Sequence, residues 1–195
     1  MFIDTTSRRA FLKAAGAAGA AWILADAADI QAAFAQVARR RSEPPPYRFD
    51  ALTAAQATDL EAVCARILPA VGAAPGAREA GAIHFIDRGL ASFNAAQKPL
   101  FDEGIADLNR RAAARWPGTA SFAALSAERQ DELLRAIEQQ PFFGAVHFAT
   151  IAGTFADPSW GGNRDHAGFA IIGHGHEPAY QPPFGWYDSP ANRGG

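Results

Sequence analysis

The chain has 195 residues, of which 49% are hydrophobic and 19% are charged, so it can bury a core and does not have the composition of a disordered protein. Its length suits a single domain, and its formal net charge of −2 gives no basic footprint for nucleic acid. Because Cys64 is the only cysteine, the chain cannot form an intramolecular disulfide, a cysteine-based zinc finger or the haem-attachment motif C-x-x-C-H.

Residues 1–35 have the pattern of an export signal. The motif S-R-R-x-F-L-K matches the twin-arginine consensus, and its specified residues are Arg8, Arg9, Phe11, Leu12 and Lys13. A Gly/Ala-rich apolar segment follows over residues 14–25, and it is shorter than the roughly 20 residues that span a bilayer. The sequence therefore predicts export to the periplasm by the twin-arginine translocase.

The sequence does not decide whether this segment is cleaved, or at which site. Two sites, Ala25-Asp-Ala27 and Ala33-Phe-Ala35, satisfy the small-x-small rule, and an uncleaved segment would serve as an anchor. The twin-arginine route carries proteins that are already folded, commonly with a cofactor in place. We therefore expect the rest of the chain either to bind a cofactor or to travel with a partner that binds one.

Residues 36–50 are predicted to form a linker. Three arginines at 39–41 precede three prolines at 44–46, which favour an extended chain. We expect the arginines to be solvated, with contact to lipid headgroups or to an acidic partner as the alternative.

A helical domain is predicted over residues 51–156, beginning with two helices. Thr53 and Gln56 have the spacing of a capping box, and apolar residues at helical spacing continue to Pro69, which stops the first helix. Cys64 lies on this apolar stripe and is expected to be buried. The second helix is predicted near residues 78–93, with His84 on its surface.

Three more helices follow. The third has Pro99 in its first turn and ends by Trp116, and the fourth has Ser126 as its cap. The fifth begins at Pro141 and carries six large apolar residues with almost no polar face, so it is predicted to be the central buried helix, with His147 in the core. The predicted fold is all-α, a bundle of about five helices with an irregular, Pro- and aromatic-rich C-terminal tail.

This tail, residues 157–195, contains the stretch DPSWGGNRDHAGFAIIG and then prolines and aromatics with few aliphatic residues. Such a composition does not build its own core, so the tail should lie along the bundle or along another protein. His174 and His176 offer a weak metal-binding alternative. The chain contains no nucleophile elbow, Walker A loop or full dinucleotide fingerprint, and so no cofactor site or catalytic set is predicted in it.

The tail motif also carries a resemblance. Asp157-Pro, then aromatic-Gly-Gly-Asn-Arg-Asp over 160–165, then Gly168-aromatic and Ile172-Gly173, resembles the signature of the gluconate 2-dehydrogenase subunit 3 family. The likeness extends back through 52–53, 67–69 and 75–81, and so covers roughly residues 50–175. The departures are local: Phe169 replaces a usual tryptophan, Ala170 a basic residue, and His174-Gly-His176 an aromatic-Pro-Gly ending.

The resemblance implies a small, non-catalytic subunit of a periplasmic, membrane-associated dehydrogenase complex. In such complexes a large FAD-binding subunit oxidises a sugar or sugar acid, and a multihaem cytochrome c subunit, carrying haem c, accepts the electrons. The small subunit would serve the co-export, folding and stabilisation of the flavoprotein. The sugar oxidised and the stoichiometry stay open.

The Gly/Asn/Arg/Asp loop has two interpretations. Its glycines and its Asn and Asp residues suit a rigid turn, and its arginine can fork onto a carboxylate. Under the first interpretation the loop docks on the flavoprotein, and under the second it braces this chain internally. The interface residues proposed are Trp160, Gly161, Gly162, Asn163, Arg164, Asp165, Gly168 and Phe169.

Two other functions remain as alternatives to the escort hypothesis, which is the co-export and stabilisation of the flavoprotein by this chain. One is an independent periplasmic binding protein with a histidine-rich metal site, and the other is a subunit that is catalytic itself. The first would purify as a stable monomer that binds metal, and the second would show activity as an isolated chain.

Overall fold

A computed structural model describes residues 48–175 of the chain. It contains six α-helices and four short 3-10 turns, and no β-strand is present in residues 48–175 beyond an isolated bridge between Val71 and Ala74. The predicted all-α fold is confirmed. The twin-arginine motif, the cleavage sites and the linker up to residue 47 lie outside the described residues, as does the chain after residue 175.

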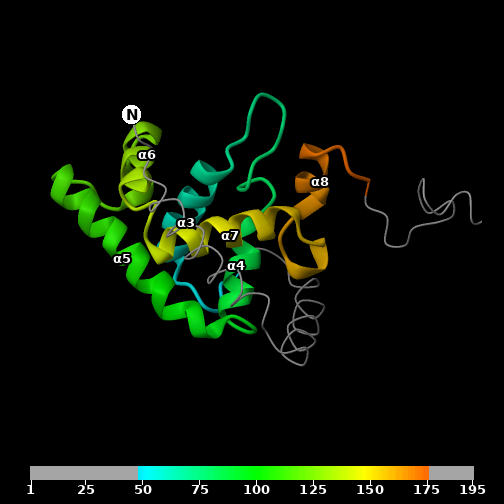
Figure 1. Cartoon of the computed structure of the whole chain (residues 1–195), viewed down its shortest axis with the longest axis horizontal. Coiled ribbons are helices and arrows are strands. Elements are labelled where there is room, and N and C mark those ends of the chain that lie inside the picture. Colours follow the sequence, from blue (N-terminus) through cyan, green and yellow to red (C-terminus); the bar gives the residue numbers. More distant parts are fainter. Residues whose placement is uncertain (1–47, 176–195) are drawn as a thin grey trace, which may run out of the picture.

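The helices follow one another with short connections. They are α3 (Ala54–Ile67), α4 (Ala82–Leu90), α5 (Lys98–Arg115), α6 (Ala127–Ala136), α7 (Pro141–Phe155) and α8 (Ala167–Ile171). The 3-10 turns are η1 (Ala95–Gln97), η2 (Phe122–Ala124), η3 (Pro158–Trp160) and η4 (Arg164–His166). Figure 1 shows α7 crossing the middle of the molecule, with α5 and α6 toward one end and α8 at the other.

The first helix forms as the sequence predicts. The backbone N–H of Gln56 donates to the Thr53 hydroxyl at 3.2 Å, and the Gln56 side chain accepts from the Thr53 backbone N–H at 3.0 Å, which completes the capping box. Cys64 is buried and accepts a hydrogen bond from the Thr150 hydroxyl at 3.2 Å. Burial raises the pKa of its thiol to about 12, so Cys64 is an inert core residue, as expected.

The second helix is shorter than predicted. It begins at Ala82 and ends at Leu90, whereas the apolar periodicity indicated residues 78–93. Gly81 adopts the left-handed conformation with φ +67°, which interrupts any helix that enters from residue 78. After Leu90 the chain turns back, because the Asn94 backbone N–H donates to the Gly89 carbonyl at 2.8 Å. Ser126 precedes α6 as predicted, but its side chain makes no capping hydrogen bond.

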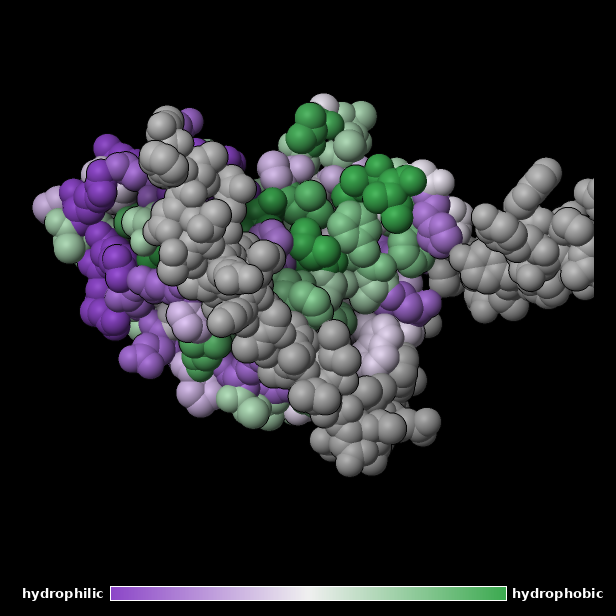
Figure 2. All heavy atoms as spheres, in the orientation of Figure 1, coloured by the Kyte–Doolittle hydropathy of each residue, from purple (hydrophilic) through white to green (hydrophobic). Residues whose placement is uncertain are grey.

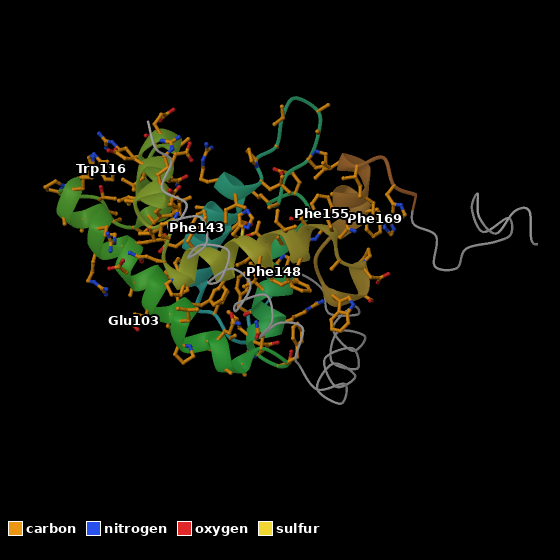
Figure 3. The ribbon with its side chains drawn as sticks, in the orientation of Figure 1. Glu103, Trp116, Phe143, Phe148, Phe155 and Phe169 are labelled. Carbon is orange, nitrogen blue, oxygen red and sulfur yellow. The ribbon has the colours of Figure 1, made fainter. Side chains whose placement is uncertain are left out.

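The helix α7 packs against α3, α4, α5 and α8, as predicted for the central helix, but one side of it is only half-buried. Its buried face consists mainly of small residues, which let α4 and α7 approach closely: a Cβ at Gly153 would lie 2.9 Å from the Ala82 carbonyl oxygen. Several large apolar residues of α7 are only half-buried, and Figure 3 labels Phe143, Phe148 and Phe155 among them. His147 is exposed and stacks on Phe143, so the prediction that His147 lies in the core is wrong.

Two buried carboxylates, those of Asp59 and Asp87, hold irregular segments to the helices. Asp59 of α3 accepts hydrogen bonds from the Asn109 side chain at 2.8 Å and from the Ala123 backbone at 2.9 Å. The core consists of buried aromatic and aliphatic side chains from α3 to α7 and from η2. Its fully buried members include Leu60, Ile86, Phe101, Leu108, Phe122 and Val146.

In residues 48–175, no helix is long and apolar enough to cross a membrane.

Candidate functional site

The loop after α7 is organised around Asn163, which is fully buried. Its side-chain nitrogen donates to the Ala156 carbonyl at 2.9 Å, and its side-chain oxygen accepts from the backbone N–H of Gly168 at 2.8 Å. Its own backbone N–H donates to the Gly153 carbonyl at 3.0 Å. One asparagine therefore ties the loop, the end of α7 and the start of α8 together.

Two glycines of the loop are required by close backbone contacts. A Cβ at Gly162 would lie 1.9 Å from the Gly153 carbonyl oxygen, and a Cβ at Gly168 would lie 1.8 Å from the Thr154 carbonyl oxygen. Both glycines are buried, and no other residue fits without moving the backbone. These contacts explain part of the motif without any partner.

Three residues of the loop that are not glycine have positive φ angles: Asn163 at +45°, Asp165 at +53° and His166 at +59°. Such conformations cost of order 1 kcal/mol each and persist only where the surrounding structure enforces them. The buried Asn163 has an internal reason, whereas Asp165 and His166 are exposed. Both lie in η4, where the His166 N–H donates to the Asn163 carbonyl at 3.0 Å.

Arg164 is attached to the fold by its backbone and presents its side chain to solvent. Its backbone N–H donates to the Ala80 carbonyl at 2.8 Å, in the turn that precedes α4. Its guanidinium lies over Gly81, 3.6 Å from where a Cβ would stand, and the residue is exposed. A guanidinium held in this way can form two parallel hydrogen bonds with a carboxylate.

His84 lies close to Arg164 and is half-buried, whereas the sequence predicted it on the helix surface. Its ring stacks on Phe49, with the ring centroids 5.9 Å apart, at the point where the chain enters the fold. Burial, and then the positive charges of Arg164 and Arg88, lower the pKa of His84 from 6.5 to about 4. The imidazole is therefore neutral near pH 7. Arg88 itself packs against Gly161, where a Cβ would meet its guanidinium.

The aromatic residues of the loop pack largely against this chain. Trp160 meets Phe93 edge to face at 5.8 Å. Phe169 of α8 stacks on His166 at 5.9 Å and meets His174 edge to face at 5.1 Å. Figure 3 shows Phe169 on α8, which packs against α7.

The eight residues proposed for a partner interface thus come together in the loop after α7 and in α8, but they do not share one role. Gly162, Asn163 and Gly168 are buried and brace the chain, whereas Trp160, Gly161 and Phe169 are half-buried. Arg164 and Asp165 are exposed and remain available for contact with another molecule.

The weak metal-binding alternative is only partly within the structure. His174 is exposed and rests against Phe169, whereas His176 lies outside the described residues. No group of three or more potential ligands (His, Cys, Asp or Glu) gathers within residues 48–175.

A hollow of about 310 Å³ lies between α3, α6 and α7, near the lower limit for small-molecule sites. It is lined by Arg66, Ile67, Asp131, Leu134, Arg135, Glu138, Phe143 and His147. None of the proposed interface residues lines it, and Arg66 and Asp131 pair across its wall at 2.7 Å.

Sequence reasoning missed Asp87, which anchors the entry of the chain. Its buried carboxylate accepts hydrogen bonds from the backbone N–H groups of Asp50, Ala51 and Leu52, at distances between 2.9 and 3.2 Å. Because Asp87 and Arg88 are adjacent on α4, one helix holds both the incoming chain and the loop. An aspartate on the apolar face of a predicted helix was the available signal.

Fold and loop together define a small all-α protein with a closely braced loop between its last two helices. The chain belongs to the gluconate 2-dehydrogenase subunit 3 family, whose model matches residues 54–175. Searches of curated proteins and of solved structures gave no match. The matched range includes every described helix and the whole loop up to Gly175.

Family membership makes this chain an accessory subunit of a multi-subunit dehydrogenase complex. The expected resemblance is therefore confirmed.

Proposed function

We propose that this chain is the small subunit that docks on an FAD-binding dehydrogenase subunit, stabilises it and escorts it to the periplasm. Membership of the family supports a role in a dehydrogenase complex, and the twin-arginine motif at Arg8 and Arg9 supports export by the twin-arginine translocase. Oxidation of the sugar or sugar acid, the FAD and the haem c of a multihaem cytochrome all belong to partner chains. The complex is associated with the periplasmic face of the cytoplasmic membrane.

The observation that carries the docking proposal is the presentation of Arg164. A flexible arginine would lose side-chain and backbone freedom on binding, but this one is fixed at its backbone by Ala80 and is flanked by strained residues. Its side chain is still exposed and makes no ion pair with a carboxylate among residues 48–175. This combination supports recognition of an acidic side chain on the flavoprotein.

The neutral state of His84 contributes to the same surface. A protonated imidazole beside Arg164 and Arg88 would add a third positive charge in a half-buried position, at a high desolvation cost. Because the ring is neutral, it adds no charge that would compete with Arg164 for a carboxylate of the partner. The positive charge of this surface then comes from the arginines alone.

The test is capture of the flavoprotein by the tagged full-length chain after co-expression, measured as bound flavin absorbance per captured chain. Arg164→Ala is expected to reduce the bound flavin about tenfold or more, as for loss of a charge-assisted interface pair. Arg129→Ala removes an exposed arginine of α6 whose guanidinium lies over Trp116 of this chain, 5.2 Å from the ring centroid; it is the matched control and is expected to retain the flavoprotein. Equal retention by Arg164→Ala and the wild type would contradict docking through this loop.

A further inference from the structure

The connection between α3 and α4 forms an apolar hairpin, defined here as residues 68–77. From 69 to 76 it reads Pro-Ala-Val-Gly-Ala-Ala-Pro-Gly, and none of these side chains carries a charge or a hydrogen-bonding group. Residues 69–74 are all exposed, and Val71 is 70% exposed. Figure 1 shows the hairpin projecting from the body of the molecule, and Figure 2 shows hydrophobic surface on the projection.

Backbone hydrogen bonds hold this hairpin in one shape. The N–H groups of Val71 and Ala74 donate to each other's carbonyls at 3.0 and 2.9 Å, and Gly72 makes the turn with φ +59°. At the base, the Ala77 N–H donates to the Leu68 carbonyl at 2.9 Å. An ordered hairpin loses little conformational entropy when another surface covers it, so its exposed apolar surface is well suited to association.

The neck of the hairpin is closely packed, which adds to its rigidity. A Cβ at Gly76 would lie 2.5 Å from the Ala70 backbone nitrogen, so the two sides of the hairpin touch through their backbones. The Gly76 N–H donates to the Glu79 carboxylate at 2.8 Å. This hydrogen bond is the largest cause that lowers the pKa of Glu79, and it keeps the nearest charge on the neck, below the apolar tip.

The hairpin is continuous with the loop that carries Arg164. The turn after the hairpin, residues 78–81, leads directly into α4, and its Ala80 carbonyl accepts the Arg164 backbone hydrogen bond at 2.8 Å. Gly81 lies beneath the Arg164 guanidinium. A partner that covers Arg164 therefore lies within reach of the hairpin as well.

We propose that the hairpin inserts into an apolar recess of the flavoprotein subunit, with Val71 as its leading side chain. The proposal rests on the proposed function, since the recess belongs to the same partner that Arg164 contacts. A contiguous exposed apolar surface on an ordered element marks an interaction site. A lipid surface fits less well, because peripheral membrane contacts combine apolar side chains with basic or aromatic ones, and residues 69–76 contain neither.

The first test is Val71→Asp in the full-length chain, co-expressed with the flavoprotein and scored by bound flavin per captured chain. Burying an unpaired carboxylate in an apolar recess is expected to reduce bound flavin about tenfold or more. Because Val71 is exposed, the circular dichroism spectrum and Tm of the free chain are expected to stay unchanged. Ala114→Asp, which adds the same charge on the exposed face of α5, is the matched control and is expected to keep the flavin.

The second test places a benzophenone-bearing amino acid at position 71 of the full-length chain and irradiates the co-expressed complex. The expected result is a cross-link to the flavoprotein, identified by mass spectrometry. A cross-link to a second copy of this chain, or to lipid alone, would overturn the proposal.

The outcomes separate this inference from the proposed function. If the wild type and Val71→Asp retain the flavoprotein equally while Arg164→Ala releases it, the hairpin proposal is wrong and the proposed function stands. If the wild type captures no flavoprotein, both are overturned.

Discussion

Gly162 lies directly against the carbonyl oxygen of Gly153, at a separation that leaves no room for a Cβ atom. An added Cβ would stand 1.9 Å from that oxygen, and the adjacent Asn163 N–H already donates to the same carbonyl at 3.0 Å. The last turn of α7 and the loop are therefore joined backbone to backbone. This contact shapes the surface on which Arg164 is presented.

Gly162→Ala is accordingly expected to lower the free energy of unfolding by on the order of 3 kcal/mol, because the backbone must move to admit the methyl group. Urea unfolding followed by circular dichroism measures this change. Gly175→Ala is the control, since a Cβ there meets nothing within 4 Å. An equal effect of both substitutions would show that the contact with Gly153 is not the cause.

Asn163→Ala is expected to destabilise the chain by about 2–4 kcal/mol. The substitution removes the acceptor of the Gly168 N–H and the donor to the Ala156 carbonyl, and it places alanine at φ +45°. Asn163→Asp keeps the acceptor, and at acidic pH its protonated carboxyl also offers an O–H donor, so at that pH its effect on urea unfolding is expected to be smaller than that of alanine. A stability equal to wild type in both variants would contradict the bracing role.

Stability should also depend on pH through His84. Its pKa is about 4 in the folded chain and 6.5 ordinarily, so between these values the unfolded chain binds more protons than the folded one. The free energy of unfolding is therefore expected to fall as the pH drops from about 6.5 to about 4. Urea unfolding across this range is expected to show a shallower slope for His84→Gln than for the wild type.

The same substitution at the exposed His147 is the control for this pH series. If His84→Gln and the wild type lose stability with identical slopes, the half-buried imidazole of His84 is not the group responsible.

The sequence predicts the helices well where local chemistry decides them. Thr53 and Gln56 define the start of α3 by themselves, and Pro141 stands at the start of α7 as expected. The start of α4 was not predicted, because the apolar stripe does not show that Gly81 takes a left-handed conformation (φ +67°) and becomes the N-cap of the helix. Periodicity reports which side chains can share a face, and it does not report where the backbone turns.

The two histidine predictions failed for a related reason. His147 lies on an apolar helix, but only one face of α7 is covered in the described chain, and the histidine is on the other. His84 was expected on the surface, but the loop of Arg164 comes from 80 residues further along the chain and covers it, a contact that single-sequence reasoning cannot find.

The candidate loop was recognisable from its residue types, but the division of its roles was not. Asn, Gly and Asp in sequence indicate a braced turn. Which glycine faces a carbonyl oxygen and which residue faces solvent depends on how α8 folds back on α7. The segment 157–175 is accordingly more regular than its composition suggested, with η3, η4 and α8 packed along the end of α7.

The central claim is that this chain escorts a flavoprotein, and the most direct measurement is the location of that flavoprotein in cells. The flavoprotein is co-expressed with the wild type or with the double variant Arg8→Lys, Arg9→Lys, and immunoblots and flavin fluorescence of periplasmic and cytoplasmic fractions are compared. Arg39→Lys, Arg40→Lys makes the same change outside the motif and is the control. We predict that the flavoprotein reaches the periplasm with the wild type and the control and stays in the cytoplasm with the double variant. Equal export with all three chains would contradict the account.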